Sequence, residues 1–153
     1  MINKTIKCIG ATSLYVLLAA ASFSAAAADK VLHLDVKDVL DASFSSGKLD
    51  GSVNFYFAGQ STPKVLKTLE EDVTNKKSNA FGKSKENACK WVMLSALMAL
   101  QEGAKARGAN AVTGIVSYYK KVEYKSASQY ECHAGSMISG VALKGRYAKL
   151  ASK

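Results

Sequence analysis

Along the first part of the chain, apolar and polar residues follow a strand period and then a helix period. Residues 31–36 alternate, with leucine and valine on one face and His33 on the other face, which we expect to meet solvent. Residues 37–46 carry apolar side chains at helical spacing, and Gly47 ends that pattern. We therefore predict a short strand followed by a short helix.

The next stretch predicts two strands and a loop. Residues 53–57, Val-Asn-Phe-Tyr-Phe, are rich in strand-forming side chains, and residues 65–69 suggest a further strand. Residues 70–85 are polar and basic and show no apolar period. We expect a loop there, and loops of this kind are candidates for mobility.

The clearest element is a helix over residues 85–107. Ser84 can cap its N-terminus, and Gly108 follows its end. Residues 91–100 are apolar except for one serine, so apolar side chains run around the whole circumference. We expect sheet or another subunit to cover the helix on most sides. The stripe predicted to face the core contains Cys89, Met93, Ala96, Leu97, Leu100 and Ala104.

The C-terminal part of the chain predicts a β-hairpin. Residues 111–124 are rich in Val, Ile, Thr and Tyr, and residues 141–150 alternate between apolar and polar side chains. Residues 125–139 form a long polar connection that contains Cys132. The element order predicts an α+β domain, with an antiparallel-rich sheet packed on one long helix plus a short helix.

Residues 1–28 have the features of a secretory signal peptide. Two lysines precede an uncharged apolar run over residues 9–23, and four alanines at 25–28 supply a small-residue cleavage site. A membrane anchor is the alternative, but the run is shorter than the roughly 20 residues of a spanning helix. We expect a single domain at residues 29–153, without a transmembrane segment, in the periplasm of a Gram-negative bacterium or secreted from it.

Composition adds a basic balance. The 153 residues include 21 Lys and Arg against 12 Asp and Glu, which gives a formal charge of +9. Loss of residues 1–28 would remove two of the lysines and no acid, leaving +7 on the mature domain. This charge favours an anionic partner, and export argues against nucleic acid in that role.

The predicted hairpin concentrates part of this charge. Its basic residues are interleaved with tyrosines, a combination that can neutralise and stack against an anionic chain. Tyrosines are also ordinary strand residues, so the pattern does not by itself require a ligand. The candidate face for an anionic ligand comprises Lys120, Lys121, Lys125, Lys144, Arg146 and Lys149.

Only two cysteines remain when Cys8 leaves with the expected signal peptide. Cys89 and Cys132 would most simply form one disulfide, because exported proteins fold in an oxidising compartment. A bridge closing a loop of about 43 residues can contribute on the order of 4 kcal/mol. The alternative is a reactive thiol or a metal site with His33 or His133, but the usual ligand spacings are absent, and we expect no metal and no cofactor.

Catalytic motifs are weak. Ser136 lies near His133 in the chain, but no G-x-S-x-G elbow surrounds it. The three acids at residues 70–72 could bind a cation, although neighbouring residues of a strand point alternately and a solvated face is simpler. We therefore expect a protein that is not an enzyme.

Several strings resemble a group of small exported proteobacterial proteins whose members often carry the label "excinuclease ATPase subunit". They are Gly-Ala-Asn-Ala-Val at 108–112, Tyr-Glu-Cys-His-Ala-Gly at 130–135 and Gly-Val-Ala-Leu-Lys-Gly at 140–145. More distantly, the chain resembles the outer-membrane Rcs stress-sensor lipoprotein and the YbjQ-type fold. That resemblance implies a disulfide between Cys89 and Cys132 and a role in envelope stress.

The label itself finds no support in the residues. An ATPase phosphate loop, G-x-x-x-x-G-K-[ST], needs glycines whose backbone amides hold the phosphates. Gly82, Lys83 and Ser84 match its end, but Lys77 stands where the first glycine is required. Paired CxxC motifs are also absent.

Together these features predict a non-enzymatic exported domain that binds an envelope component or a protein partner through the basic hairpin face. The expected partner is an envelope protein or an anionic glycolipid or polysaccharide. The alternative is an oligomeric structural or envelope-stress-related protein. In that case a homo-oligomer would cover the apolar helix at residues 85–107.

Overall fold

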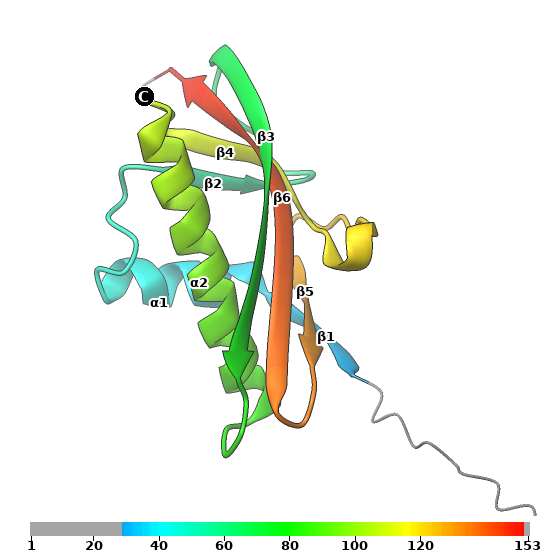
Figure 1. Cartoon of the computed structure of the whole chain (residues 1–153). Coiled ribbons are helices and arrows are strands. Elements are labelled where there is room, and N and C mark those ends of the chain that lie inside the picture. Colours follow the sequence, from blue (N-terminus) through cyan, green and yellow to red (C-terminus); the bar gives the residue numbers. More distant parts are fainter. Residues whose placement is uncertain (1–28, 152–153) are drawn as a thin grey trace, which may run out of the picture.

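A computed structural model describes residues 29–151 (Figure 1). The expected signal peptide, residues 1–28, lies outside the described residues. No helix among the described residues is long and apolar enough to cross a membrane. The elements are β1 (Lys30–Asp35), α1 (Val36–Ser45), β2 (Asn54–Phe57), β3 (Val65–Asn79), α2 (Lys85–Ala106), β4 (Ala111–Ser117), the short 3-10 helix η1 (Tyr119–Lys121), β5 (Gln129–Ala134) and β6 (Ile138–Leu150).

The strands form one mixed sheet with β6 at its centre. The order is β1-β5-β6-β4-β2, and β3 pairs with the other edge of β6. The β3–β6 pairing is antiparallel and runs the whole length of β6, while β5 and β4 share the opposite edge. Only β2 and β4 pair in parallel within the described sheet. The predicted α+β class is confirmed, and the sheet is mixed with two helices.

Helix α2 packs along the inner face of this sheet (Figure 1). All six residues of its predicted core stripe are buried. The Ser84 hydroxyl accepts a hydrogen bond from the Asn87 amide at 3.2 Å, and Gly108 adopts a left-handed φ of 66° after the helix end. The signals at both helix ends are therefore confirmed.

One flank of α2 is open to solvent in a single copy of the domain, so the sheet alone does not cover the helix on most sides, and cover by another subunit stays a prediction. Trp91 is 56% exposed, and Met98, two turns further along the same face of the helix, is also exposed. The sheet covers the stripe that contains Cys89, whereas α1 meets only part of the opposite side. One copy of the domain therefore leaves some of the apolar side chains around α2 exposed.

Two predicted loops contain strands. Residues 70–85 were expected to be a loop, but β3 continues to Asn79 and leaves only a short connection before α2. These residues show no apolar alternation in the sequence, because β3 lies at a sheet edge, where most positions are exposed and polar side chains are tolerated. The connection at 125–139 likewise contains β5, in which Tyr130, Cys132 and Ala134 alternate inward and are buried.

Candidate functional site

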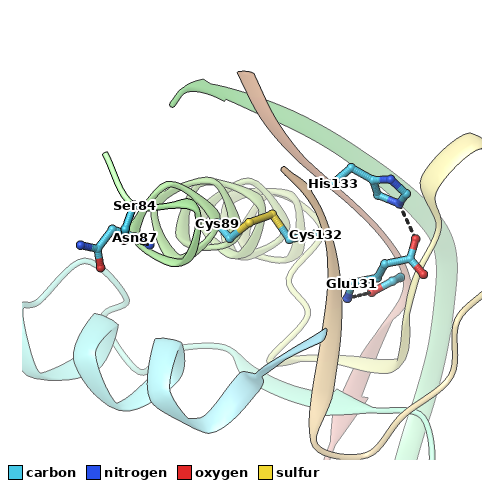
Figure 2. The surroundings of a disulfide bond; sticks show 7 residues. Ser84, Asn87, Cys89, Glu131, Cys132 and His133 are labelled. Atoms are coloured by element: carbon cyan, nitrogen blue, oxygen red, sulfur yellow. Dashed lines mark hydrogen bonds and ion pairs between the residues drawn. A yellow bond between two sulfur atoms is a disulfide. The ribbon is translucent and has the colours of Figure 1, made fainter. Parts of the chain in front are cut away.

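Strand β5 has an inner and an outer side, and the disulfide lies on the inner side. Cys89 of α2 and Cys132 of β5 are bonded, with their Cα atoms 5.9 Å apart, and both are buried. Figure 2 shows Cys132 pointing toward α2, whereas its neighbours Glu131 and His133 point to the opposite side of the strand. The predicted disulfide is confirmed, and neither cysteine is free to act as a thiol or a metal ligand.

Half of the predicted basic face is neutralised by two acids. Arg146 lies 3.3 Å from Glu71, and Lys125 lies 3.2 Å from Glu123. Lys144 forms an ion pair with Glu123 and lies 3.8 Å from Glu71. The hydrogen bonds from Lys144 and Lys125 hold the pKa of Glu123 below its usual value. These three cations are therefore paired within the domain, and together with the two acids they keep a net charge of only +1.

Lys149 lies apart from the other predicted cations. It pairs in register with Lys67 near the end of β6, and its ammonium group is 3.3 Å from the Gly108 carbonyl oxygen. The η1 turn instead lies over Gly140, near the beginning of the same strand. The structure does not bring the six predicted residues together on one face.

The turn that contains Lys120 and Lys121 has an unusual backbone. The two lysines have φ angles of 50° and 66° and are the only non-glycine residues with positive φ in the described chain. A left-handed conformation costs an L-residue roughly 1–2 kcal/mol, and such strain tends to occur at functional sites. Neither lysine forms an ion pair within residues 29–151.

Aromatic stacking fixes this turn on the sheet. The Tyr119 ring stacks on His133 of β5, with centroids 3.4 Å apart and planes 15° from parallel. The Lys120 ammonium lies 5.6 Å from the centre of the Tyr119 ring. A Cβ at Gly140 of β6 would lie 3.8 Å from the Lys77 side chain of β3 and 3.8 Å from the Tyr119 ring, so both side chains approach this glycine. We call these five residues, Lys77, Tyr119, Lys120, Lys121 and His133, the Tyr119 cluster.

Both histidines of the chain approach one carboxylate beside this cluster. His133 Nε2 lies 2.5 Å from Glu131, and His33 Nε2 lies 3.9 Å from it. The His33 ring packs at a tilt on Tyr124 with centroids 4.4 Å apart. The prediction that His33 lies on the solvent face of its strand is confirmed. An open cleft of about 390 Å³ adjoins the cluster, lined by Asp29, Tyr119, Lys120, Val122, Glu131 and His133.

The remaining sequence candidates are separated in space. Of the three acids at 70–72, Glu70 pairs with Arg107, Glu71 takes part in the ion pairs above, and Asp72 accepts a 2.6 Å hydrogen bond from the Tyr147 hydroxyl. The alternation expected for neighbouring strand residues is therefore present, and the acids do not converge. His133 contacts Glu131 and Tyr119, and no hydrogen bond joins it to Ser136 among the described residues.

A second hollow, not predicted from the sequence, lies between the two helices. This groove of about 380 Å³ has an apolar floor made by Val39 and Ala42 of α1 and Trp91 and Leu94 of α2, and its other lining residues are polar or charged. An ion pair of 3.4 Å between Lys90 and Asp38 closes part of its rim. The groove continues the open flank of α2.

Comparison of the chain with protein-family models, curated proteins and solved structures found no match. The chemistry of the site must therefore be argued from its own side chains. No group of three His, Cys, Asp or Glu residues within 29–151 is placed to hold a metal ion. The Tyr119 cluster has the Lys120 ammonium beside a stacked aromatic pair, with Lys121 next in the turn and the Lys77 side chain near Gly140. The adjoining cleft also contains the acids Asp29 and Glu131.

The sequence identified only part of this cluster. Lys120 and Lys121 were predicted within a larger basic face, but Lys77 was assigned to a loop and His133 to a polar connection. Their proximity depends on two strand pairings, β3 with β6 and β5 with β6. The Tyr119 stacking had no sequence signal.

Proposed function

We propose that this protein is a non-enzymatic exported domain that binds an anionic glycan of the cell envelope through the Tyr119 cluster. The observation that carries this proposal is the contrast among the lysines. Lys144 and Lys125 both form ion pairs with Glu123, whereas Lys77, Lys120 and Lys121 form no ion pair within the described chain. Unpaired cations beside a rigid aromatic surface favour a ligand with negative charge and flat faces.

Sugar rings with acidic substituents have both properties. The apolar C–H face of a sugar ring packs on an aromatic ring, and the Tyr119–His133 stack holds such a ring in place. The lysines around it can then pair with carboxylate, sulfate or phosphate groups. Because the strained turn already fixes the Lys120 and Lys121 backbones, little loop entropy remains to be lost on binding.

The test compares two sets of lysines that carry equal charge. Lys77→Gln, Lys120→Gln and Lys121→Gln, combined, should weaken binding to an anionic polysaccharide by about tenfold or more and reduce its salt dependence. The control is Lys64→Gln, Lys67→Gln and Lys149→Gln, which removes the same charge at the other end of the β3–β6 pair and should change binding by about twofold or less.

Titration calorimetry at several salt concentrations measures both sets, with a neutral polysaccharide as the reference ligand. Undetectable binding of the native domain, or binding that does not depend on salt, would contradict the proposal. Equal losses in the two variants would show that only net charge matters and that the Tyr119 cluster is not the site.

A second candidate function follows from the open flank of α2. An oligomeric structural or envelope-stress-related protein, as the resemblance to the Rcs stress sensor and the YbjQ-type fold suggests, would bury Trp91 and the groove beside it against another copy. A strictly monomeric mass in solution across a wide concentration range would contradict this candidate. A soluble quencher of Trp91 fluorescence tests the same point. Quenching that becomes weaker as the protein concentration rises would support this candidate.

A further inference from the structure

Two turns lie side by side at one end of the molecule (Figure 1). One is the connection between β3 and α2, and the other joins β5 to β6. The Ala80 amide donates a 2.8 Å hydrogen bond to the Met137 carbonyl oxygen, which ties the two turns together. Asn79 also pairs in register with Ile138. The two turns therefore form one structural unit.

This unit presents three large apolar side chains to solvent. Phe81 is 75% exposed, Met137 is 64% exposed and Ile138 is 56% exposed. A single exposed apolar residue is normal, but three on adjoining turns form a patch of the kind that marks an interaction site. We call Phe81, Met137 and Ile138 the apolar tip.

The charge around the apolar tip has one dominant sign. Residues 76–86 contain four lysines and one acid, Glu86, and residues 135–139 contain no charge. None of the four lysines forms an ion pair within the part of the chain that the structure describes. They are Lys76, Lys77, Lys83 and Lys85.

The backbone of the tip is compatible with a nonpolar environment. The Phe81 amide donates to the Asn79 side-chain oxygen at 2.8 Å, and the Gly135 amide donates to the Ile138 carbonyl at 2.9 Å. The Lys83 amide donates to the Ala80 carbonyl at 3.1 Å. Because these three donors already have partners, moving the turns out of water costs less than it would with those amides unsatisfied.

We propose that the apolar tip inserts into the surface of an anionic phospholipid bilayer. The tip projects from the end of the domain, and neither of the two hollows described above is formed by Phe81, Met137 or Ile138. A projecting apolar tip suits a soft surface that needs no complementary pocket, and the surrounding lysines suit anionic headgroups. Their long side chains can keep the ammonium groups at headgroup level while the apolar residues go deeper.

This inference extends beyond the proposed glycan binding and uses a different surface. Lys77 is common to both, but the tip is defined by apolar residues outside the Tyr119 cluster. Insertion would hold the domain at a membrane with η1 and its lysines near the headgroup layer. The experiment therefore changes apolar residues first and leaves Lys120 and Lys121 in place.

The test measures partitioning of the domain onto vesicles of phosphatidylglycerol mixed with phosphatidylcholine, with pure phosphatidylcholine as the reference. The combined variant Phe81→Ser, Met137→Ser and Ile138→Ser should lower the partition coefficient by about tenfold or more. The matched control Leu66→Ser, which removes a side chain that is 60% exposed at the other end of β3, should change it by about twofold or less.

Insertion itself has a spectroscopic signature. In a Trp91→Phe background, Phe81→Trp should shift the fluorescence emission to shorter wavelength with anionic vesicles and leave it unshifted with neutral ones. Absence of native partitioning at low salt, an unshifted emission of the Phe81→Trp variant with anionic vesicles, or equal partitioning of the triple variant and the native domain would overturn the proposal. Loss of a protein partner in the triple variant with vesicle binding unchanged would assign the tip to that protein instead.

The two proposals can fail separately. Lys120→Gln with Lys121→Gln should weaken polysaccharide binding and leave the vesicle-induced emission shift in place. The triple tip variant should retain polysaccharide affinity within about twofold, because its residues lie outside the Tyr119 cluster.

Discussion

The two faces of strand β5 are held by different kinds of interaction. On the inner face, Tyr130, Cys132 and Ala134 are fully buried, and a disulfide fixes Cys132 to α2. On the outer face, Glu131 and His133 are positioned by a polar contact and by ring stacking on a strained turn (Figure 2). The inner face therefore contributes to the stability of the domain, while the outer face carries the groups to which we assign the proposed binding. Changes on the two faces should have separable effects.

The largest expected effect comes from removing the disulfide on the inner face. Cys89→Ser with Cys132→Ser should lower the free energy of unfolding by about 2–5 kcal/mol, because the unfolded chain regains the freedom of a 43-residue loop. Denaturant unfolding measures this loss, and reduction of the native domain should reproduce it. Polysaccharide affinity at a temperature where the variant is folded should stay unchanged. A parallel loss of affinity would contradict the separation of the two faces.

The next largest effect concerns the contact between α2 and β6. A Cβ at Gly103 would overlap the hydroxyl oxygen of buried Tyr147, which donates its hydrogen bond to Asp72. Gly103→Ala should therefore destabilise the domain by about 1–3 kcal/mol, although alanine favours helices. The control is Ser95→Ala on an exposed position of the same helix, which should be neutral or slightly stabilising. A more stable Gly103→Ala variant would contradict the close approach.

The inner face is also the part of the molecule that the sequence predicts well. The core stripe of α2 follows from the helical period, because its apolar residues share one face of the helix and that face packs on the sheet. The pairing of Cys89 with Cys132 follows from the expected export and from the two cysteines that would remain without residues 1–28. The sequence does not reveal β3 beyond residue 69, because one side of this edge strand is exposed and the half-buried side carries polar residues such as Asp72 and Thr74, so no apolar period appears.

The outer face could not be predicted because its contacts depend on strand register. Glu131 meets His33 only because β1 pairs with β5 at that position, and Glu71 meets Arg146 only through the β3–β6 register. Alternation correctly placed Lys144 on a mainly polar face, but it did not reveal that Glu123 would neutralise it. A count of lysines therefore overstates the free charge of the predicted basic face.

A smaller effect should appear at the strained turn, where stability and binding are expected to change in opposite directions. Lys121→Gly removes the side chain from a left-handed position and should stabilise the domain by about 0.5–1 kcal/mol, after the entropy cost of glycine. The same change removes a cation from the Tyr119 cluster and should weaken polysaccharide binding. Lys125→Gly is the control, because Lys125 is not left-handed, and it should not stabilise the domain. Loss of stability in Lys121→Gly would show that the turn is not strained.

The smallest expected effect tests whether Lys144 and Lys125 are neutralised in the native protein. Glu123→Gln removes their shared partner, so both cations become available and binding to a sulfated polysaccharide should tighten by about twofold. The hydrogen bond that Lys144 donates to Glu123, together with a second from Lys125, lowers the pKa of Glu123 below its ordinary value of 4.5. The ion pairs are therefore complete at neutral pH and are lost only as the pH falls through that lowered pKa.

A pH titration of binding distinguishes this pairing from a general effect of net charge. Sulfate groups remain ionised in acid, so the affinity of the native domain should rise toward that of Glu123→Gln as Glu123 takes up its proton. Glu102→Gln is the matched control: it removes an exposed acid that contacts Lys105 on α2, far along the chain from the basic turn. If Glu102→Gln tightens binding as much as Glu123→Gln, the outer face responds to total charge, and the pairing of its lysines has no bearing on recognition.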